Sequence, residues 1–182
     1  MKLTIYLGNP GTEYKRTRHN AGFLVCDEIH PSVSWQKKFH GLFAQDPDKI
    51  LKPQTFMNLS GISVGEAATF YHLKPEEILV VHDDLELPFG TVRLQRGGGL
   101  QGHNGLRSIK EQIGSDQFAR CRIGIGRPKY GNIAQYVLTP FSADEEISLG
   151  LMLPRIRELL EREVFPSEFV LEGLPPVDKH RR

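Results

Sequence analysis

The chain has 182 residues, 39% of them hydrophobic, and a formal net charge of +1 at pH 7, which is enough for one domain with its own core. No apolar run approaches the ~20 residues that a membrane-spanning helix needs, and residues 1–11 reach glycine and proline too early for a signal peptide, so we expect a cytoplasmic protein that does not enter a membrane. Two cysteines, Cys26 and Cys121, are too few for a disulfide framework, so we expect reduced thiols in the core.

The first half of the chain alternates short apolar runs with helical patterns. Residues 3–7 predict a strand, and Asn20 can cap a helix that ends near Ile29, before His30-Pro31. Three short strands are predicted at 35–39, 42–45 and 49–52, then a helix at 59–72. The continuous apolar run 78–81 predicts a central strand that is buried on both faces.

The second half continues this alternation. Strands are predicted at 92–95 and 118–126, with a helix at 104–113 between them. Ser142-Ala-Asp-Glu145 is a capping box that starts a long amphipathic helix, which Pro154 should kink or split. Together these elements predict a single-domain three-layer α/β/α sandwich around a mixed, mostly parallel twisted sheet, spanning 1–182, with 166–182 as a mobile tail.

A polar loop at residues 9–22, NPGTEYKRTRHNAG, follows the first strand and holds one histidine, His19. Catalytic groups in α/β proteins collect at the carboxyl ends of strands. His19 can act as a general base near neutral pH when a second group orients it, and Asp83, just after the buried run 78–81, is the leading candidate. The alternative is a surface histidine and an aspartate that belongs only to the turn DDLELP.

No side-chain nucleophile and no metal site is predicted. The chain has no G-x-S-x-G motif, and both cysteines are expected in the core. The seven histidines lack HExxH or any other paired-ligand spacing, and no Cys/His cluster is present. If His19 is a base, water is therefore the expected nucleophile.

Asn9, Asn58 and Asn104 each follow or start a predicted element. An amide side chain offers a donor and an acceptor, so it can hold a carbonyl, support an oxyanion or bind a peptide backbone. The alternative is structural, because asparagine is a common cap and turn residue. The finding of three such residues together with a histidine and an aspartate favours the functional interpretation.

The glycine-rich segment 97–105, GGGLQGHNG, ends where a helix is predicted to begin. Such a loop can bind phosphate or let a large ligand approach the backbone. It matches neither the Walker A motif nor the dinucleotide-binding fingerprint, which argues against a cofactor-dependent dehydrogenase.

Positive charge is concentrated in one third of the chain. Residues 91–130 contain eight basic and two acidic residues, an excess of six positive charges. This asymmetry predicts one face that meets an anionic partner, and the alternative is a set of solvated strand faces.

Four segments, LGNPGTEYKRTRHNAG, KPQTFMNLSG, ILVVHDDLELPFGTVRLQRGGGLQGHNGL and RCRIGIGRP, together resemble bacterial-type peptidyl-tRNA hydrolases from residue 2 to about residue 141. The resemblance implies a metal- and cofactor-free enzyme with one α/β domain and a mixed sheet. It implies hydrolysis of the ester between a peptide and the terminal ribose of tRNA, which releases free tRNA and peptide, so the implied partner is peptidyl-tRNA. Nothing in the sequence demands more than a monomer.

The resemblance also implies roles for individual residues. His19 corresponds to the catalytic histidine and Asp83 to the carboxylate that orients it. Implied substrate contacts are Asn9, Asn58 and Asn104, the tRNA-site residue Tyr14, the peptide-cleft residues Phe56 and Met57, and the loop residue His103. The chemistry is consistent, because an ester has a better leaving group than an amide and a histidine-activated water could suffice.

Two positions depart from the family pattern. Gln95 stands where the family has a basic residue that clamps a tRNA phosphate, while Arg122 matches the other clamp position. Arg93 and Arg96 flank Gln95 and could replace it, although Arg96 would need a local twist or bulge because adjacent strand residues face opposite ways. Pro154 and the short tail put the covering role of the family's C-terminal helix in question.

A non-catalytic RNA-binding protein of the same fold is the alternative function. Such a protein would keep the basic face but would have no need to retain His19 with Asp83. Since both are present with all three asparagines, we expect the esterase.

Overall fold

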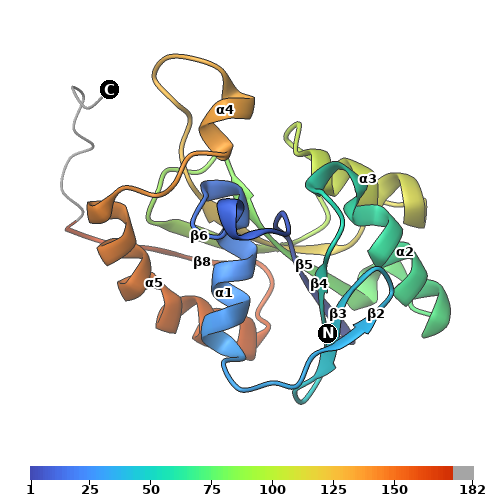
Figure 1. Ribbon diagram of the computed structural model, residues 1–182. Coiled ribbons are helices and arrows are strands. Elements are labelled where there is room, and N and C mark those ends of the chain that lie inside the picture. Colours follow the sequence, from blue (N-terminus) through green and yellow to red (C-terminus); the bar gives the residue numbers. More distant parts are fainter. Residues whose placement is uncertain (174–182) are drawn as a thin grey trace.

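One mixed sheet of eight strands runs through residues 1–173, the part of the chain that the computed structural model describes (Figure 1). The strands are β1 (Leu3–Tyr6), β2 (Gln36–Lys38), β3 (Gly41–Gln45), β4 (Lys49–Pro53), β5 (Ile78–Asp84), β6 (Thr91–Arg96), β7 (Ala119–Gly124) and β8 (Ser167–Val170). Their order across the sheet is β2-β3-β4-β1-β5-β7-β6-β8.

Parallel pairing is confined to the centre of this sheet. The pairs β4–β1, β1–β5 and β5–β7 are parallel, whereas the two pairs at each edge are antiparallel. The predicted mixed, mostly parallel sheet is confirmed in the sense that six of the eight strands run in the same direction and only β3 and β6 run the other way. The edge made by β2, β3 and β4 is antiparallel because these strands follow one another through turns too short for a crossover.

Helices cover both faces, which confirms the three-layer sandwich. α1 (Ala21–Ile29) and α5 (Ala143–Arg162) lie on one face, and α2 (Ser60–Phe70) and α3 (Asn104–Ile113) on the other (Figure 1). Each face has its own apolar cluster, one including Phe23 and Met152 and the other including Val64 and Ile109. The run 78–81 is buried, as predicted, and the burial extends over all seven residues of β5.

The start of α1 lies unusually close to the backbone directly after β1 and in the middle of β5. A Cβ atom on Gly22 would be 2.5 Å from the carbonyl oxygen of Leu7 and 2.6 Å from that of Val81. Only glycine allows this approach, because both obstacles are backbone atoms. The turn η2 (Arg18–Asn20) directly precedes α1, so this contact brings His19 to the end of β5.

The structure differs from the predictions mainly after residue 126. A short helix, α4 (Ile133–Val137), was not predicted, and α5 continues through Pro154 instead of splitting. The predicted mobile tail is wrong for Ser167–Val170, which forms β8 against β6; residues 174–182 lie outside the described part.

Both cysteines are free and buried, as predicted, and burial raises the pKa of the Cys121 thiol to about 12. Among the described residues, no helix combines the length and apolar character needed to span a bilayer.

Candidate active site

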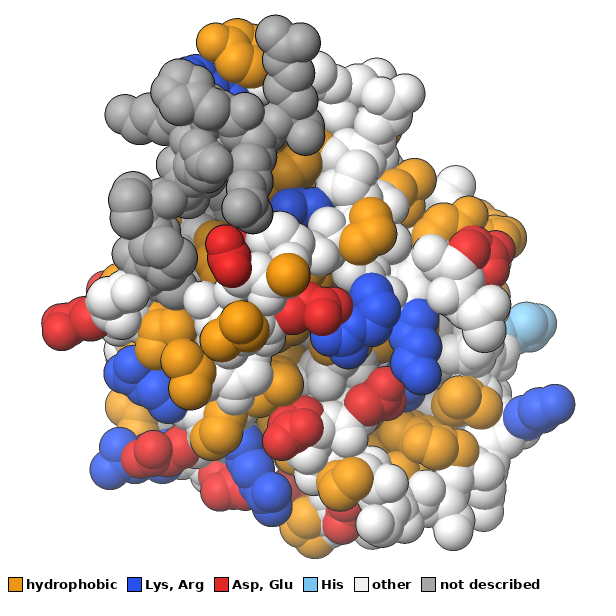
Figure 2. Space-filling model, turned by 60° about the vertical axis from the view of Figure 1, so that its left-hand side comes forward, with side chains coloured by type: hydrophobic (Ala, Val, Ile, Leu, Met, Phe, Trp, Pro, Cys, Tyr) orange, Lys and Arg blue, Asp and Glu red, His pale blue; other side chains and the backbone are white. Residues whose placement is uncertain are grey.

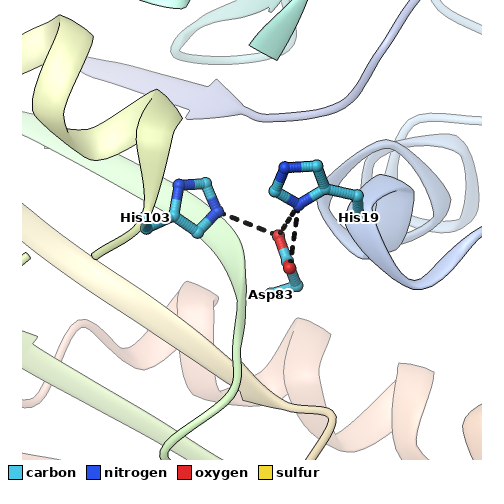
Figure 3. A group of neighbouring side chains, drawn as sticks. All are labelled: His19, Asp83 and His103. Atoms are coloured by element: carbon cyan, nitrogen blue, oxygen red, sulfur yellow. Dashed lines mark hydrogen bonds and ion pairs between the residues drawn. The ribbon is translucent and has the colours of Figure 1, made fainter. Parts of the chain in front are cut away.

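His19 and Asp83 lie together at the carboxyl end of β5 (Figure 3). His19 Nδ1 is 3.0 Å from Oδ1 and 2.9 Å from Oδ2 of Asp83. Because an ionised carboxylate only accepts, Nδ1 carries the hydrogen and Nε2 keeps a lone pair. Nε2 has no hydrogen-bond partner among the described residues, while the His19 side chain remains 12% exposed. The arrangement is that of an oriented general base.

His103 contacts the same carboxylate from the other side (Figure 3). Its Nε2 lies 2.9 Å from Asp83 Oδ1, and its Nδ1 accepts hydrogen bonds from the backbone N–H groups of Gly105 at 3.1 Å and Leu106 at 3.3 Å. His103 is thus the N-cap residue of α3. The neutral Nε2–H tautomer is the form that satisfies all three contacts.

These three side chains also offer ligand atoms within 4.8 Å of one another, so a metal ion must be considered. A metal on His103 Nε2 would need a lone pair there, while the Nδ1 lone pair already accepts two backbone hydrogen bonds. Neutral imidazole has only one lone pair to offer. The donor set therefore fits a hydrogen-bonded cluster better than a metal centre.

Neighbouring groups shift the pKa values of His19 and Asp83 in the direction opposite to burial. Burial lowers the pKa of His19, but the negative charge of Asp83 and the hydrogen bond to it raise that pKa above the ordinary 6.5. Burial would raise the pKa of Asp83, yet its two imidazole neighbours, His19 and His103, hold it well below its ordinary value. Asp83 is therefore ionised wherever His19 is neutral enough to act as a base.

His82 was not predicted as a site residue, and its ring packs against that of His103. Its side chain is buried, and Nδ1 donates a 2.8 Å hydrogen bond to the carbonyl oxygen of Asp83. The His82 and His103 ring centroids are 5.2 Å apart in an edge-to-face arrangement. Burial, followed by the proximity of His103, lowers the pKa of His82 to about 4, so this ring is neutral near pH 7.

Asn9 is fixed in place through its backbone and one side-chain atom. Asn20 Oδ1 accepts from Asn9 N at 2.8 Å, and Asn20 Nδ2 donates to Asn9 O at 2.9 Å. Asn9 Oδ1 accepts from Met57 N at 2.7 Å, so its Nδ2 is the atom left to donate. Asn20 was predicted only as a helix cap; its side chain makes no cap bond and instead holds Asn9.

The other predicted substrate residues are carried by the neighbouring turns. Asn58 and Asn104 are exposed, on η3 (Met57–Leu59) and at the start of α3. These two turns touch, because a Cβ on Gly105 would lie 2.6 Å from Met57 Sδ. Phe56 is 55% exposed and its ring centroid is 6.2 Å from that of Tyr14, whereas Met57 is buried.

Arg18 links the His19 turn to the segment between α4 and α5. Its Nη1 donates to Pro140 O at 2.7 Å and its Nη2 lies 2.6 Å from Glu145 Oε1. The guanidinium also stacks over the Tyr136 ring at 4.6 Å. No local pattern indicates this role, since these partners are more than 100 residues away in the chain.

The predicted tRNA-contacting arginines already have partners within the chain. Arg122 Nε lies 2.7 Å from Asp84 Oδ2 and its Nη1 donates to Gln95 Oε1 at 3.0 Å. Arg93 pairs with Glu168 at 2.8 Å, and Arg96 stacks over the Phe165 ring at 4.3 Å.

Strand register separates the two arginines that flank Gln95. Arg93 lies opposite Arg122 and Gln95 opposite Arg120, so these four side chains share one sheet face, while Arg96 belongs to the other. Opposite charges are intermixed elsewhere too: on the face seen in Figure 2, basic and acidic side chains alternate over short distances.

Comparison with known proteins gives a consistent result. The family model described as peptidyl-tRNA hydrolase matches residues 3–168. A peptidyl-tRNA hydrolase of Geotalea uraniireducens is 48% identical over 96% of this chain and 93% of its own, and one of Treponema pallidum is 47% identical over 88% and 85%. The crystal structure of peptidyl-tRNA hydrolase from Acinetobacter baumannii superposes with a TM-score of 0.81 at 36% identity, covering 89% of both chains.

Proposed function

This chain belongs to the peptidyl-tRNA hydrolase family and hydrolyses the ester bond of peptidyl-tRNA, and we propose that a water molecule activated by His19 performs the attack. One observation carries the proposal. His19 donates from Nδ1 to the buried Asp83 carboxylate, so Nε2 keeps a lone pair that has no partner among the described residues, in a side chain that is still accessible. That is the geometry a general base requires.

The reaction follows from this geometry. Nε2 of His19 takes a proton from water as the water oxygen bonds to the ester carbonyl carbon, and Asp83 stabilises the imidazolium that forms. When the bond from that carbon to the ribose oxygen breaks, the imidazolium returns the proton to the leaving hydroxyl. The products are free tRNA and a peptide with a new carboxylate.

Neutral amides support the charge that develops on the ester oxygen. Asn9 presents Nδ2 from a fixed backbone, and Asn58 and Asn104 are exposed on the turns beside it. Donors held before the reaction stabilise an oxyanion without reorganisation. In this proposal Phe56 and Met57 line the peptide site with His103 beside it, and Tyr14, in contact with Phe56, meets the terminal nucleotides.

The tRNA body is bound through its phosphates. Arg122 and Arg93 on the shared face of β6 and β7 supply these contacts, with Arg96 at the end of β6. Such contacts are independent of sequence and sensitive to salt. We expect the chain to act as a metal-independent, cytoplasmic monomer of one domain.

The alternative of a non-catalytic RNA-binding protein is tested together with the mechanism. The protein is incubated with an N-blocked aminoacyl-tRNA, with and without chelator, and ester cleavage is measured. Cleavage that survives chelation supports the proposal. Loss of cleavage on chelation would contradict the metal-free mechanism, and tRNA binding without cleavage would favour the binding protein.

A further inference from the structure

We propose that His103 is a positioning residue that sets the basicity of His19 by sharing the Asp83 carboxylate with it. The inference rests on the proposed role of His19 as the base and goes beyond it. It assigns His103 a function that acts through Asp83 and needs no contact with substrate.

The first argument is the division of Asp83 between two donors. His19 Nδ1 lies 3.0 Å from Oδ1 and 2.9 Å from Oδ2, while His103 Nε2 lies 2.9 Å from Oδ1. Asp83 is only 2% exposed, and among the described residues His19 and His103 are the donors to its carboxylate. A carboxylate that already accepts one strong hydrogen bond is a weaker acceptor and a weaker stabiliser of a second cationic partner. His103 thereby limits how strongly Asp83 favours the protonated form of His19.

The second argument is that His103 is held in one tautomer and one position. Its Nδ1 accepts the N–H groups of Gly105 and Leu106 at the start of α3, where the positive end of the helix also opposes a proton on that atom. Its ring lies between those of His19 and His82, with centroid distances of 5.1 and 5.2 Å. In the tautomer that satisfies these contacts, Nε2–H is directed at Asp83.

The third argument is that the other charged groups around the cluster are paired, so Asp83 is the charge that acts most strongly on His19. Asp84 on β5 is paired with Arg122 on β7 at 2.7 Å, and Arg18 beside His19 is paired with Glu145. His82 donates to the Asp83 backbone and is neutral near pH 7. The neighbouring η3 contributes no titratable group, and on α3 itself Arg107 is exposed.

The consequence concerns the pH at which the base works. A general base is most effective when its pKa lies near the operating pH. With one donor removed from Asp83, its full attraction would act on His19 and raise the pKa of His19 further. The enzyme would then need a higher pH to keep His19 unprotonated.

Two substitutions separate the two contacts of His103. Asn can place an oxygen near the position of Nδ1 and cap α3, but it is too short to reach Asp83; Gln can place an amide N–H near the position of Nε2 but does not cap. We expect His103→Asn to raise the pKa of His19 by about 0.5–1 pH unit and His103→Gln to leave it close to that of the wild type.

The readout is the NMR titration of the His19 ring, which does not depend on activity. Ser115→Ala is the control, because Ser115 Oγ also accepts a backbone N–H group, that of Gln117, but lies beyond the other end of α3 and outside the cluster; it should leave the titration unchanged. An unchanged or lowered pKa in His103→Asn, or equal shifts in both His103 variants, would overturn the inference. A merely structural His103 would reduce stability and activity in both without moving the titration selectively.

A measurement on the wild-type protein keeps the inference testable if a variant does not fold. Nitrogen-15 chemical shifts distinguish the two neutral tautomers of each histidine. We expect His103 as Nε2–H and His19 as Nδ1–H at pH 7.5, and a proton on His103 Nδ1 would overturn the inference. Failure of the proposed function is recognised separately, as full ester cleavage by His19→Ala whatever the titrations show.

Discussion

The active-site cluster and the basic face of β6 and β7 were both predicted from the sequence, but they are built in opposite ways. In the candidate active site, Nδ1 of His19 is bound to the Asp83 carboxylate, while Nε2 has no hydrogen-bond partner among residues 1–173 and points to the chemistry. On the basic face the cations are already matched by partners from the same chain, Arg93 by Glu168 and Arg122 by Asp84.

The difference teaches that preorganisation, and not the number of charged groups, marks the functional atoms. Buried groups with fixed partners create a specific reactive site because the surrounding dipoles need not reorganise. The Arg93–Glu168 pair is exposed, and such pairs contribute little stability and exchange easily, so Arg93 can leave its carboxylate for a phosphate. The Arg122–Asp84 pair is buried, so Arg122 is held in a fixed position. We therefore expect substitutions in the cluster to reduce turnover and substitutions on the basic face to tune tRNA affinity.

His19→Ala should have the largest effect. Loss of a general base costs about 10²–10⁴-fold in rate, and we expect that loss in kcat on N-blocked aminoacyl-tRNA while tRNA affinity is unchanged. His72→Ala, which alters an exposed histidine after α2, is the matched control and should retain wild-type kcat. Full activity of His19→Ala would rule out the proposed base.

Asp83→Asn should have the second-largest effect and lower kcat about 10–10²-fold. His19 and the three asparagines remain in place, but the imidazolium that forms on His19 loses the negative charge that stabilises it. Single-turnover cleavage compares the two variants directly. If Asp83→Asn is more damaging than His19→Ala, Asp83 has a more direct part in the reaction than orienting His19.

Arg18→Ala should reduce kcat by about 10-fold, because a small displacement of the base is costly, and should destabilise the fold by about 1–3 kcal/mol through the lost charged hydrogen bonds. Arg18→Lys should recover only part of the activity, since an ammonium cannot reach both Pro140 O and Glu145. Kinetics well below the unfolding temperature separate the two effects. Wild-type kcat in Arg18→Ala would show that the link to the α4–α5 segment does not position His19.

Glu168→Gln should have the smallest effect, on binding alone. Releasing Arg93 should strengthen tRNA binding by about 2–5-fold, in keeping with a surface ion pair, and steepen the salt dependence of binding by up to about one unit. Glu161→Gln is the control, because Glu161 pairs with Arg157 on α5. Equal affinity in both variants would mean that Arg93 does not bind tRNA.

The sequence predicted the elements up to residue 126 and the meeting of His19 with Asp83, because strand ends and turn residues are local signals. It did not predict the double role of His103, since which ring nitrogen carries the hydrogen depends on Gly105, Leu106 and Asp83 together. The pairing of Arg93 with Glu168 was missed because β8 was taken for a mobile tail. Long-range contacts of this kind leave no periodic trace in the sequence.

The central claim is that Asp83 raises the basicity of a histidine that must be neutral to act. The pKa of His19 lies above 6.5, so kcat/KM should fall as the pH decreases through a value above 6.5. In Asp83→Asn the charge that raises this pKa is gone while burial, which lowers it, remains.

The most direct test is the pH dependence of kcat/KM for both proteins on N-blocked aminoacyl-tRNA. We predict that the acidic limb lies at lower pH in Asp83→Asn than in the wild type. Limbs that coincide, or a limb that moves to higher pH in Asp83→Asn, would contradict the account.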